Sequence, residues 1–275
     1  MGKTTFALQV LRNVVAGGAP GLYFSFEHDA PTVLERLIAI EASAQHGVEA
    51  VTLRRIREAM EAMTEQEGGL SRRLAGTAGG VEALATLQGY ADRLYVHRAS
   101  GSDTTVEAIR EVVGQVQRAH GQAPIVIVDY LQKVFVPAGS EIEEERVTAI
   151  VEGLKDLALD ADLPVLAIVA ADKEGLVAGK RLRVHNLRGS SALAYEADVV
   201  LIMNDKYDVV ARHHLVYNVG NAERFRNYVV VTIEKNRSGL DRIDLEFRKR
   251  FEQGRFEVDG MPVAEQLVDE RVFVE

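Results

Sequence analysis

The chain has 275 residues, of which 47% are hydrophobic and 27% are charged, and it contains no cysteine. This balance is typical of a globular protein with a full core, and the lack of cysteine excludes disulfides and thiolate metal sites. The formal net charge of −9 disfavours a nucleic-acid-binding surface that is basic overall. No apolar run long enough to span a bilayer and no signal peptide are found, so we expect a cytoplasmic protein without a membrane partner.

The chain opens with MGKTTFALQV, in which Gly2-Lys3-Thr4 matches the second half of the phosphate-binding pattern G-x-x-x-x-G-K-[ST]. In such a loop, backbone N–H groups at a helix N-terminus hold phosphates, the lysine reaches the β- and γ-phosphates, and the hydroxyl ligates Mg²⁺. The first half of the pattern is absent. We therefore expect a phosphate loop truncated at the N-terminus and followed by a helix over 4–16. Taken alone, the tripeptide is a weak signal, because a solvated helix start is the commoner explanation.

Strand-like and helix-like periodicities alternate along the next two hundred or so positions. Short apolar runs predict strands over 21–27, 93–97, 124–129, 163–170 and 197–203. Helical spacing predicts helices over 30–42, 104–121 and 141–161, and the polar stretch 47–92 is expected to be an exposed helical elaboration. The alternation indicates an α/β fold with a mostly parallel central sheet flanked by helices.

The pattern changes after residue 204. Apolar runs separated by short polar turns predict antiparallel β-hairpins in a β-rich C-terminal part, 204–275: HHLVYNV, NYVVVTIEKN, RIDLEFR and GRFEVDG. His213 and His214 fall on the first run, where neighbouring side chains point to opposite faces, so we expect no shared metal there. No internal repeat or long linker interrupts the chain, and a single domain over 1–275 is the simplest organisation.

Two carboxylates fall where an open α/β sheet binds its ligands. Asp129 ends the strand 124–129 and Glu27 ends the strand 21–27, so both are expected at the carboxyl edge of the sheet, beside the Lys3 loop. A Mg-nucleotide site needs a carboxylate that holds the hydrated metal and a base that orients the attacking water. These roles suit Asp129 and Glu27, although an aspartate that caps a turn at a strand end is also common.

Several segments resemble the RecA-like ATPase domain of the DnaB family of replicative helicases, over nearly the whole chain. MGKTTFALQV is similar to that family's phosphate loop and first helix, and YFSFEHDAPTVLERLIA to the segment that holds its catalytic glutamate. IVIVDYLQ is the most specific match. KRLRVHNLRGSSALAYEADVVLIM resembles the DNA loop and the following strand, and IEKNRSG resembles the segment that reaches the neighbouring subunit's γ-phosphate.

The resemblance implies a RecA-like P-loop NTPase fold, ATP and Mg²⁺ as cofactors, and an ATP-dependent DNA helicase activity in DNA replication. It also implies a homo-hexameric ring that acts on single-stranded DNA with other replication proteins. Nucleotide binding is implied for Gly2, Lys3, Thr4, Thr5 and Asp129, of which Thr4 and Asp129 also serve the metal, Asp129 through water.

Glu27 is implied as the base, and Lys235 and Arg237 as a finger that acts in trans on the neighbouring subunit. Without the resemblance, EKNR would be interpreted as a hairpin turn with solvated charges. The basic stretch between two strands is implied to contact DNA phosphates, and its cations are Lys173, Lys180, Arg181, Arg183 and Arg188. A solvated, flexible loop is the alternative for that stretch.

The sequence also departs from the family pattern. Ala170 stands where the family usually has a glutamine that senses the γ-phosphate, and a methyl group cannot hydrogen-bond phosphate. The segment after Asp129 is acidic where a second DNA-contacting loop is expected, with Glu141, Glu143, Glu144 and Glu145. Two other functions therefore stay open: a KaiC-like regulatory ATPase that does not translocate DNA, and a degenerate, non-hydrolysing binding module.

Overall fold

The computed structural model describes residues 2–62, 69–137, 141–172, 175, 177, 179–189, 191–216 and 219–270. A parallel sheet forms its first half, in the strand order β2 (Leu94–Arg98), β1 (Gly21–Ser25), β3 (Ile125–Asp129) and β4 (Val165–Ala167). Every residue of β1 and β3 is buried, as expected of strands that are covered on both faces. The predicted parallel α/β architecture is confirmed.

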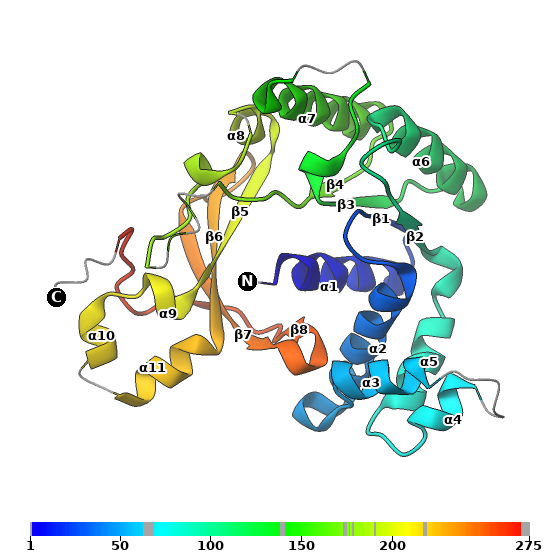
Figure 1. The fold of residues 1–275 in the computed structure, drawn as a ribbon, viewed down its shortest axis with the longest axis horizontal. Helices are drawn as coiled ribbons and strands as arrows, with labels where there is room; N and C mark the ends of the chain where they lie inside the picture. Colours follow the sequence, from blue (N-terminus) through cyan, green and yellow to red (C-terminus); the bar gives the residue numbers. More distant parts are fainter. Residues whose placement is uncertain are drawn as a thin grey trace.

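Helices cover both faces of this sheet (Figure 1). One face packs against α1 (Lys3–Ala16) and α2 (Ala30–His46), and the other against α6 (Val106–His120) and α7 (Glu143–Asp160). Because strand side chains alternate, Tyr23 lies in the core with α1 and α2, whereas Phe24 lies in the core with α6 and α7. The sequence therefore builds two apolar layers on one set of strands.

The predicted helical elaboration contains α3 (Leu53–Glu61), α4 (Leu70–Leu74) and α5 (Gly80–Gln88). α3 and α5 pack on α2, and α4 packs on α3 and α5. Ile56, Leu74 and Ala83 are fully buried in the same core as α1 and α2. The expectation that this stretch is simply exposed is therefore wrong for its inner side, which extends the core (Figure 1).

An antiparallel sheet forms the second half (Figure 1). Its strands are β5 (Val199–Asp205), β6 (Tyr228–Asn236), β7 (Ile243–Arg250), β8 (Arg255–Phe256) and β9 (Met261–Pro262). The predicted C-terminal hairpins are confirmed in this part. β8 docks on α1, because the side chain of Gln9 donates to the carbonyl of Phe256 at 3.1 Å and accepts from its N–H at 3.0 Å.

The prediction of a strand over HHLVYNV is wrong. The connection between β5 and β6 contains α9 (Lys206–Val209), α10 (Arg212–Val216) and α11 (Val219–Arg226), and both His213 and His214 lie in α10. A short apolar run does not distinguish helix from strand, and here Phe225 of α11 is fully buried against the sheet. Within the described residues, no group of three metal-binding side chains includes these histidines.

The remaining short elements are helical turns. They are η1 (Gly47–Glu49), η2 (Ala91–Arg93), η3 (Leu131–Lys133), η4 (Val184–Asn186) and η5 (Phe251–Gln253), together with the short helix α8 (Ala192–Glu196). Among the helices in the described part of the chain, none has the length and apolar character needed to cross a membrane.

Candidate functional site

The predicted site residues Thr4, Glu27 and Asp129 converge on the carboxyl edge of the parallel sheet. Asp129 is the last residue of β3 and is paired in register with Ser25, the last residue of β1. The N–H of Phe26 donates to the carbonyl of Asp129 at 2.9 Å, and this bond fixes the segment that leads to Glu27. Ligands of open parallel sheets bind at such an edge.

A hydroxyl from the start of α1 meets the carboxylate at the end of β3. Thr4 Oγ1 donates to Asp129 Oδ2 at 2.8 Å, although the two residues are 125 positions apart in the chain. Tyr23 Oη donates to the same oxygen at 2.6 Å. Asp129 is 2% exposed, so these neutral donors hold its carboxylate inside the protein.

Tyr23 was missed by the sequence analysis, because a tyrosine in a buried strand gives the same apolar signal as any core residue. Burial raises the pKa of its hydroxyl, and the neighbouring charge of Asp129 raises that pKa further. The hydroxyl therefore remains protonated and acts as a permanent donor that orients Asp129.

The N-terminus of α1 is open to an anion. The helix has no side-chain cap and no acidic residue in its first turn, so the positive end of its dipole is not compensated. Gly2 stands at the cap position with φ +83°, and a Cβ there would lie 2.7 Å from Phe256 Cζ and 2.9 Å from Phe251 Cζ. Glycine is required there, because backbone and packing both exclude a side chain.

These residues fit a magnesium-bound phosphate. Thr4 and Asp129 supply hydroxyl and carboxylate oxygens, which are the ligand types that Mg²⁺ prefers, and Lys3 is exposed beside them. Uncapped N–H groups at the start of α1 suit phosphate oxygens. Thr5 is 6% exposed and its side chain packs into the protein, so only its backbone N–H suits a phosphate.

Glu27 lines an open cleft at the same edge. The cleft has a volume of about 600 Å³ and is lined by residues 25–29, Thr32, residues 98–101 and Lys133. Glu27 is exposed, so water reaches its carboxylate. A carboxylate in contact with solvent next to a phosphate site can orient a water molecule.

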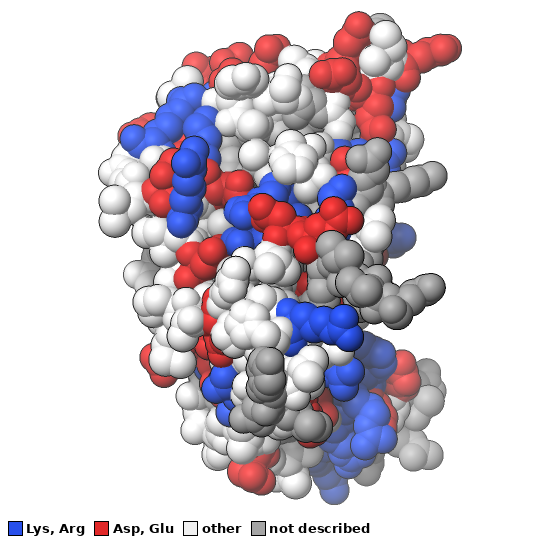
Figure 2. All heavy atoms as spheres, turned by 90° about the vertical axis from the view of Figure 1, so that its left-hand side faces the viewer, with Lys and Arg blue, Asp and Glu red and all other residues white. Residues whose placement is uncertain are grey.

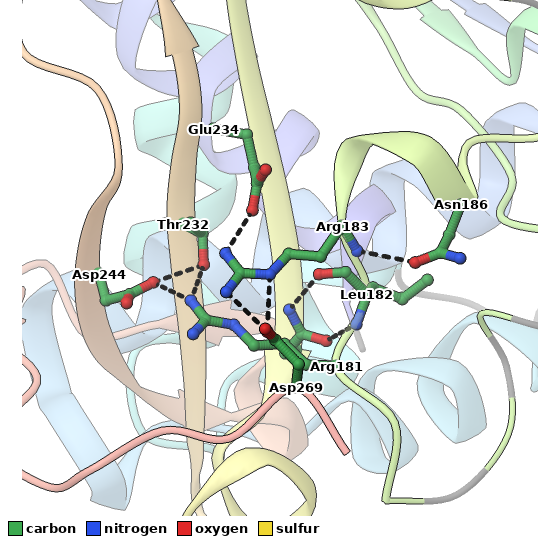
Figure 3. A network of polar contacts seen from close by, with 9 residues as sticks. Arg181, Leu182, Arg183, Asn186, Thr232, Glu234, Asp244 and Asp269 are labelled. Atoms are coloured by element: carbon green, nitrogen blue, oxygen red, sulfur yellow. Dashed lines mark hydrogen bonds and ion pairs between the residues drawn. The ribbon is translucent and has the colours of Figure 1, made fainter.

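The basic stretch that was expected to contact DNA is largely engaged in ion pairs inside the protein (Figure 3). Arg181 is 5% exposed, and its guanidinium donates to Thr232 Oγ1 at 3.0 Å and to Asp244. Arg183 pairs with Glu234 at 2.8 Å and with Asp269 at 2.6 Å. These contacts attach the stretch to β6, β7 and the C-terminal segment.

The geometry therefore does not support Arg181 as a DNA contact, because its charge is buried and neutralised. Figure 2 shows the face of the molecule that carries this region, where blue and red side chains lie side by side across the middle. A second, smaller cleft of about 380 Å³ at this place is lined by cations and carboxylates together, Arg183, Asp269 and Glu270 among them. The expected basic surface is thus electrostatically mixed.

The other cations of the stretch are more accessible. Lys180 is half-buried, and Arg188 is exposed and pairs with Glu143 at 2.8 Å. Lys173 lies outside the described residues. The acidic segment after Asp129 also finds an explanation, since Glu143, Glu144 and Glu145 form the first turn of α7, where carboxylates favour the helix dipole.

Gln132, the last residue of the DYLQ tetrapeptide, connects the sheet edge to the basic stretch. Its side chain accepts from the N–H of Ala170 at 3.2 Å and donates to the carbonyl of Arg188 at 2.9 Å. Both partners are backbone groups, so the methyl side chain of Ala170 does not prevent these contacts. The sequence analysis missed this residue, because nothing in its spacing revealed which loops it joins.

Lys235 and Arg237 lie near one another, away from the phosphate-binding edge. Lys235 Nζ donates to the carbonyls of Ala194 and Tyr195 at 2.7 and 2.8 Å, and Arg237 donates to Tyr195 at 2.6 Å and pairs with Asp198 at 3.2 Å. Burial and the charge of Arg237 lower the pKa of Lys235. Among the described residues, none of their hydrogen bonds reaches α1 or β3.

Comparisons with known proteins agree with this geometry. The model of the DnaB-like helicase C terminal domain family matches residues 1–257. The replicative DNA helicase DnaB of Haemophilus influenzae is 28% identical over 255 residues, which are 91% of this chain and 48% of that protein. DnaB of Pasteurella multocida is 27% identical over 255 residues, with the same coverage. The chain thus spans about half the length of these relatives.

Two solved structures share the fold. The first, an ATPase domain, has a TM-score of 0.70 and 23% identity, and the match covers 93% of this chain and 80% of that one. The second, a DnaB-like replicative helicase studied with its interactions with primase, has a TM-score of 0.69 and 21% identity, and the match covers 93% of this chain and 56% of that one. At these identities the likeness establishes the fold.

Proposed function

Since the chain belongs to the family of DnaB-like helicase C-terminal domains, we propose that it is an ATP-hydrolysing motor domain that acts on single-stranded DNA in replication. The observation that carries this proposal is the 2.8 Å hydrogen bond between Thr4 and Asp129, which joins the start of α1 to the end of β3. Glu27 follows the neighbouring strand at the same edge. A hydroxyl, a carboxylate and a solvent-accessible base are thereby gathered at one uncapped helix N-terminus.

Each group has a distinct role in the proposed reaction. Lys3 and the N–H groups of residues 2–5 bind the phosphates of ATP, and Thr4 and Asp129 hold Mg²⁺, Asp129 through water. Bound Mg²⁺ supplies positive charge at the phosphate oxygens. Glu27 orients the attacking water, and Tyr23 keeps Asp129 in position through its 2.6 Å hydrogen bond.

Lys235 and Arg237 are proposed to act in trans within a homo-hexameric ring. Both are held against α8 and Asp198 on the second sheet, and within the described residues neither bonds to the phosphate-binding edge. A cation that serves a neighbouring subunit belongs on such a separate surface, and it stabilises charge that builds up in the transition state. The chain is proposed to work as a single domain with further replication proteins as partners.

DNA contacts are proposed for Lys180 and Arg188, with Lys173 as a further candidate by sequence position. Arg188 pairs with an exposed partner, Glu143, and exposed pairs are weak enough to exchange for a phosphate. Arg181 and Arg183 instead hold the basic stretch on the second sheet. The hydrogen bonds of Gln132 to Ala170 and Arg188 give a direct route from the sheet edge to this stretch.

ATP turnover with and without oligo-dT tests the proposal, with Lys3→Ala as the blank. Arg54→Ala, which removes an exposed cation on α3 that has no role in the proposed site, is the matched control. We expect turnover that rises with DNA, that is retained in Arg54→Ala and that is lost in Lys3→Ala.

The alternatives predict different results. Turnover that is lost in Lys3→Ala but does not respond to DNA would favour the KaiC-like regulatory ATPase. Wild-type turnover no higher than that of Lys3→Ala would favour the non-hydrolysing binding module and would contradict the proposed motor.

A further inference from the structure

The cleft beside Glu27 contains two cations that form no ion pair with a described residue. Arg98 is the last residue of β2 and Lys133 is the last residue of η3, and both line the cleft of about 600 Å³. Both side chains are exposed. The side-chain nitrogen of Lys133 lies 5.9 Å from the centroid of the Tyr130 ring.

The backbone close to each cation is fixed by hydrogen bonds to a neighbouring segment. Next to Arg98, the N–H of Ala99 donates to the carbonyl of Ser25 at 2.9 Å, so the end of β2 is fixed to β1. Next to Lys133, the buried Leu131 donates its N–H to the carbonyl of Ile168 at 2.9 Å. The positions from which the two charges extend are therefore preorganised, and binding requires ordering of side chains alone.

The cleft lining also contains two acidic residues, Asp29 and Glu27, and neither forms an ion pair with Arg98 or Lys133. Asp29 caps α2, where its carboxylate accepts from the N–H of Thr32 at 3.0 Å, and hydrogen bonds from Thr32 lower the pKa of Asp29, with a smaller contribution from the charge of Arg98. Its negative charge thus already compensates the positive end of the α2 dipole. Glu27 is the other carboxylate of the cleft lining, and it caps no helix.

We propose that this cleft binds the phosphodiester backbone of single-stranded DNA, with Arg98 and Lys133 contacting its phosphates. The inference rests on the proposed function and adds to it a second strand-binding site, lined by residues outside the basic stretch 180–188. Two separated cations on an open cleft suit an extended anion, which can enter and leave along its length. Because Glu27 lines the same cleft, a bound strand changes the electrostatic environment of the proposed base.

The test compares strand binding by the wild type and by the double variant Arg98→Gln/Lys133→Gln. Fluorescence anisotropy with labelled oligo-dT is measured over a series of salt concentrations. We expect the double variant to bind about tenfold more weakly at moderate salt, and the slope of log K against log[salt] to fall by about 1.4, because two phosphate contacts are lost. The matched control, Arg54→Gln/Arg55→Gln, removes two exposed cations from α3 and should keep the wild-type affinity and slope.

Wild-type affinity and slope in the double variant would overturn the inference and leave the proposed motor intact, provided that wild-type turnover is lost in Lys3→Ala. A wild type that neither hydrolyses ATP nor binds oligo-dT would overturn both together. Circular dichroism checks that the variant is folded. If the double variant is misfolded, photo-cross-linking of the wild type to thiothymidine-substituted oligo-dT replaces the binding measurement. Cross-links in 98–101 or 131–134 support the inference, and cross-links found only elsewhere contradict it.

Free inorganic phosphate carries the same charged oxygens as a DNA backbone and is the other ligand class that suits the two cations of the cleft. Competition by inorganic phosphate and by ATP against labelled oligo-dT separates the sources. One combination of results would mark a small-anion site and overturn strand binding. In it, millimolar phosphate displaces oligo-dT from the wild type, and the wild type and the double variant have the same strand affinity once phosphate is removed. Strand affinity that depends on Arg98 and Lys133 in the absence of phosphate supports it.

Discussion

Two groups of basic side chains in this protein differ in what surrounds them. Arg181, Arg183 and Arg188 form the most basic stretch of the sequence, yet each pairs with a carboxylate in the fold. Arg98 and Lys133 are 35 positions apart and form no motif, yet they line one cleft without an ion pair to a described residue. Charge in the sequence is therefore not the same as charge available to a ligand, because partners that are distant in the chain neutralise it.

The comparison also reconciles a net charge of −9 with the proposed binding of a polyanion. Carboxylates on β6, β7 and the C-terminal segment are placed against the arginines of the stretch 180–188, and this pairing attaches the stretch to the second sheet (Figure 3). The same acids would repel DNA at that place. A cleft with few, unpaired cations attracts phosphates locally without a basic overall surface.

The largest expected effect on stability is that of Arg181→Met, which tests whether Arg181 is a structural residue. It leaves the partly buried Asp244 without its ion-pair partner, with the Thr232 hydroxyl as a remaining donor, and it removes the donor to the buried Thr232 hydroxyl. Removal of one partner from a buried ion pair is strongly destabilising. We expect the free energy of unfolding to fall by about 3 kcal/mol, measured by urea denaturation with circular dichroism. A loss below about 1 kcal/mol would show that Arg181 is not a structural residue.

A second paired cluster has a smaller expected effect and a defined pH dependence. Glu265 contacts Lys206 at 2.5 Å and Arg224 at 2.9 Å. Burial raises the pKa of Glu265, but the hydrogen bond and charge of Lys206 outweigh burial, and the pKa is lowered below 4.5. A carboxylate with a lowered pKa in the folded state stabilises the protein above its unfolded pKa, and this stabilisation is lost as the pH falls through the folded value.

Glu265→Gln should therefore lower the free energy of unfolding by about 2 kcal/mol at pH 7. Urea denaturation at a series of pH values should show the gap between variant and wild type closing as the pH falls through the lowered pKa of Glu265. Glu152→Gln, which changes an exposed carboxylate on α7, serves as the control and should show no such gap. A gap that stays constant with pH would mean that the ionisation of Glu265 does not contribute.

Much of the fold followed from local pattern. The buried strands β1 and β3 are short apolar runs that end in polar residues, and the helices between them have clear apolar spacing, so their order predicted the parallel sheet. The strand predicted over HHLVYNV, 213–219, was wrong where the structure describes it, because residues 213–216 lie in α10 and so short an apolar run does not define a period.

The candidate site was predictable to the extent that it depends on strand ends. Asp129 and Glu27 end predicted strands, and parallel strands bring their carboxyl ends to one edge. Tyr23 and Gln132 were not predictable, because their roles depend on which distant atoms their side chains reach. Pairing of Arg181 with Asp244, 63 positions away, is likewise a tertiary property that local charge cannot reveal.

Arg188→Gln tests whether an exposed arginine of the basic stretch contributes less to stability than the buried Arg181. Its partner Glu143 is exposed, and both side chains remain largely in water, so the pair contributes little. We expect the free energy of unfolding to fall by less than about 1 kcal/mol in urea denaturation, well below the effect of Arg181→Met. Equal losses in the two variants would mean that burial does not separate the structural arginines from the accessible ones.

The smallest effect on stability is expected where the effect on binding is largest. Arg98→Gln/Lys133→Gln removes two exposed cations that have no ion pair among the described residues, so little native interaction energy is lost. The free energy of unfolding should change by less than about 0.5 kcal/mol, and it can rise slightly if like charges in the cleft repel one another. Urea denaturation at low and high salt measures this directly, because salt screens repulsion between exposed charges. A fall in the free energy of unfolding of more than about 1 kcal/mol would show that the two side chains stabilise the cleft. Weaker strand binding by this variant would then reflect a change in structure rather than the loss of phosphate contacts.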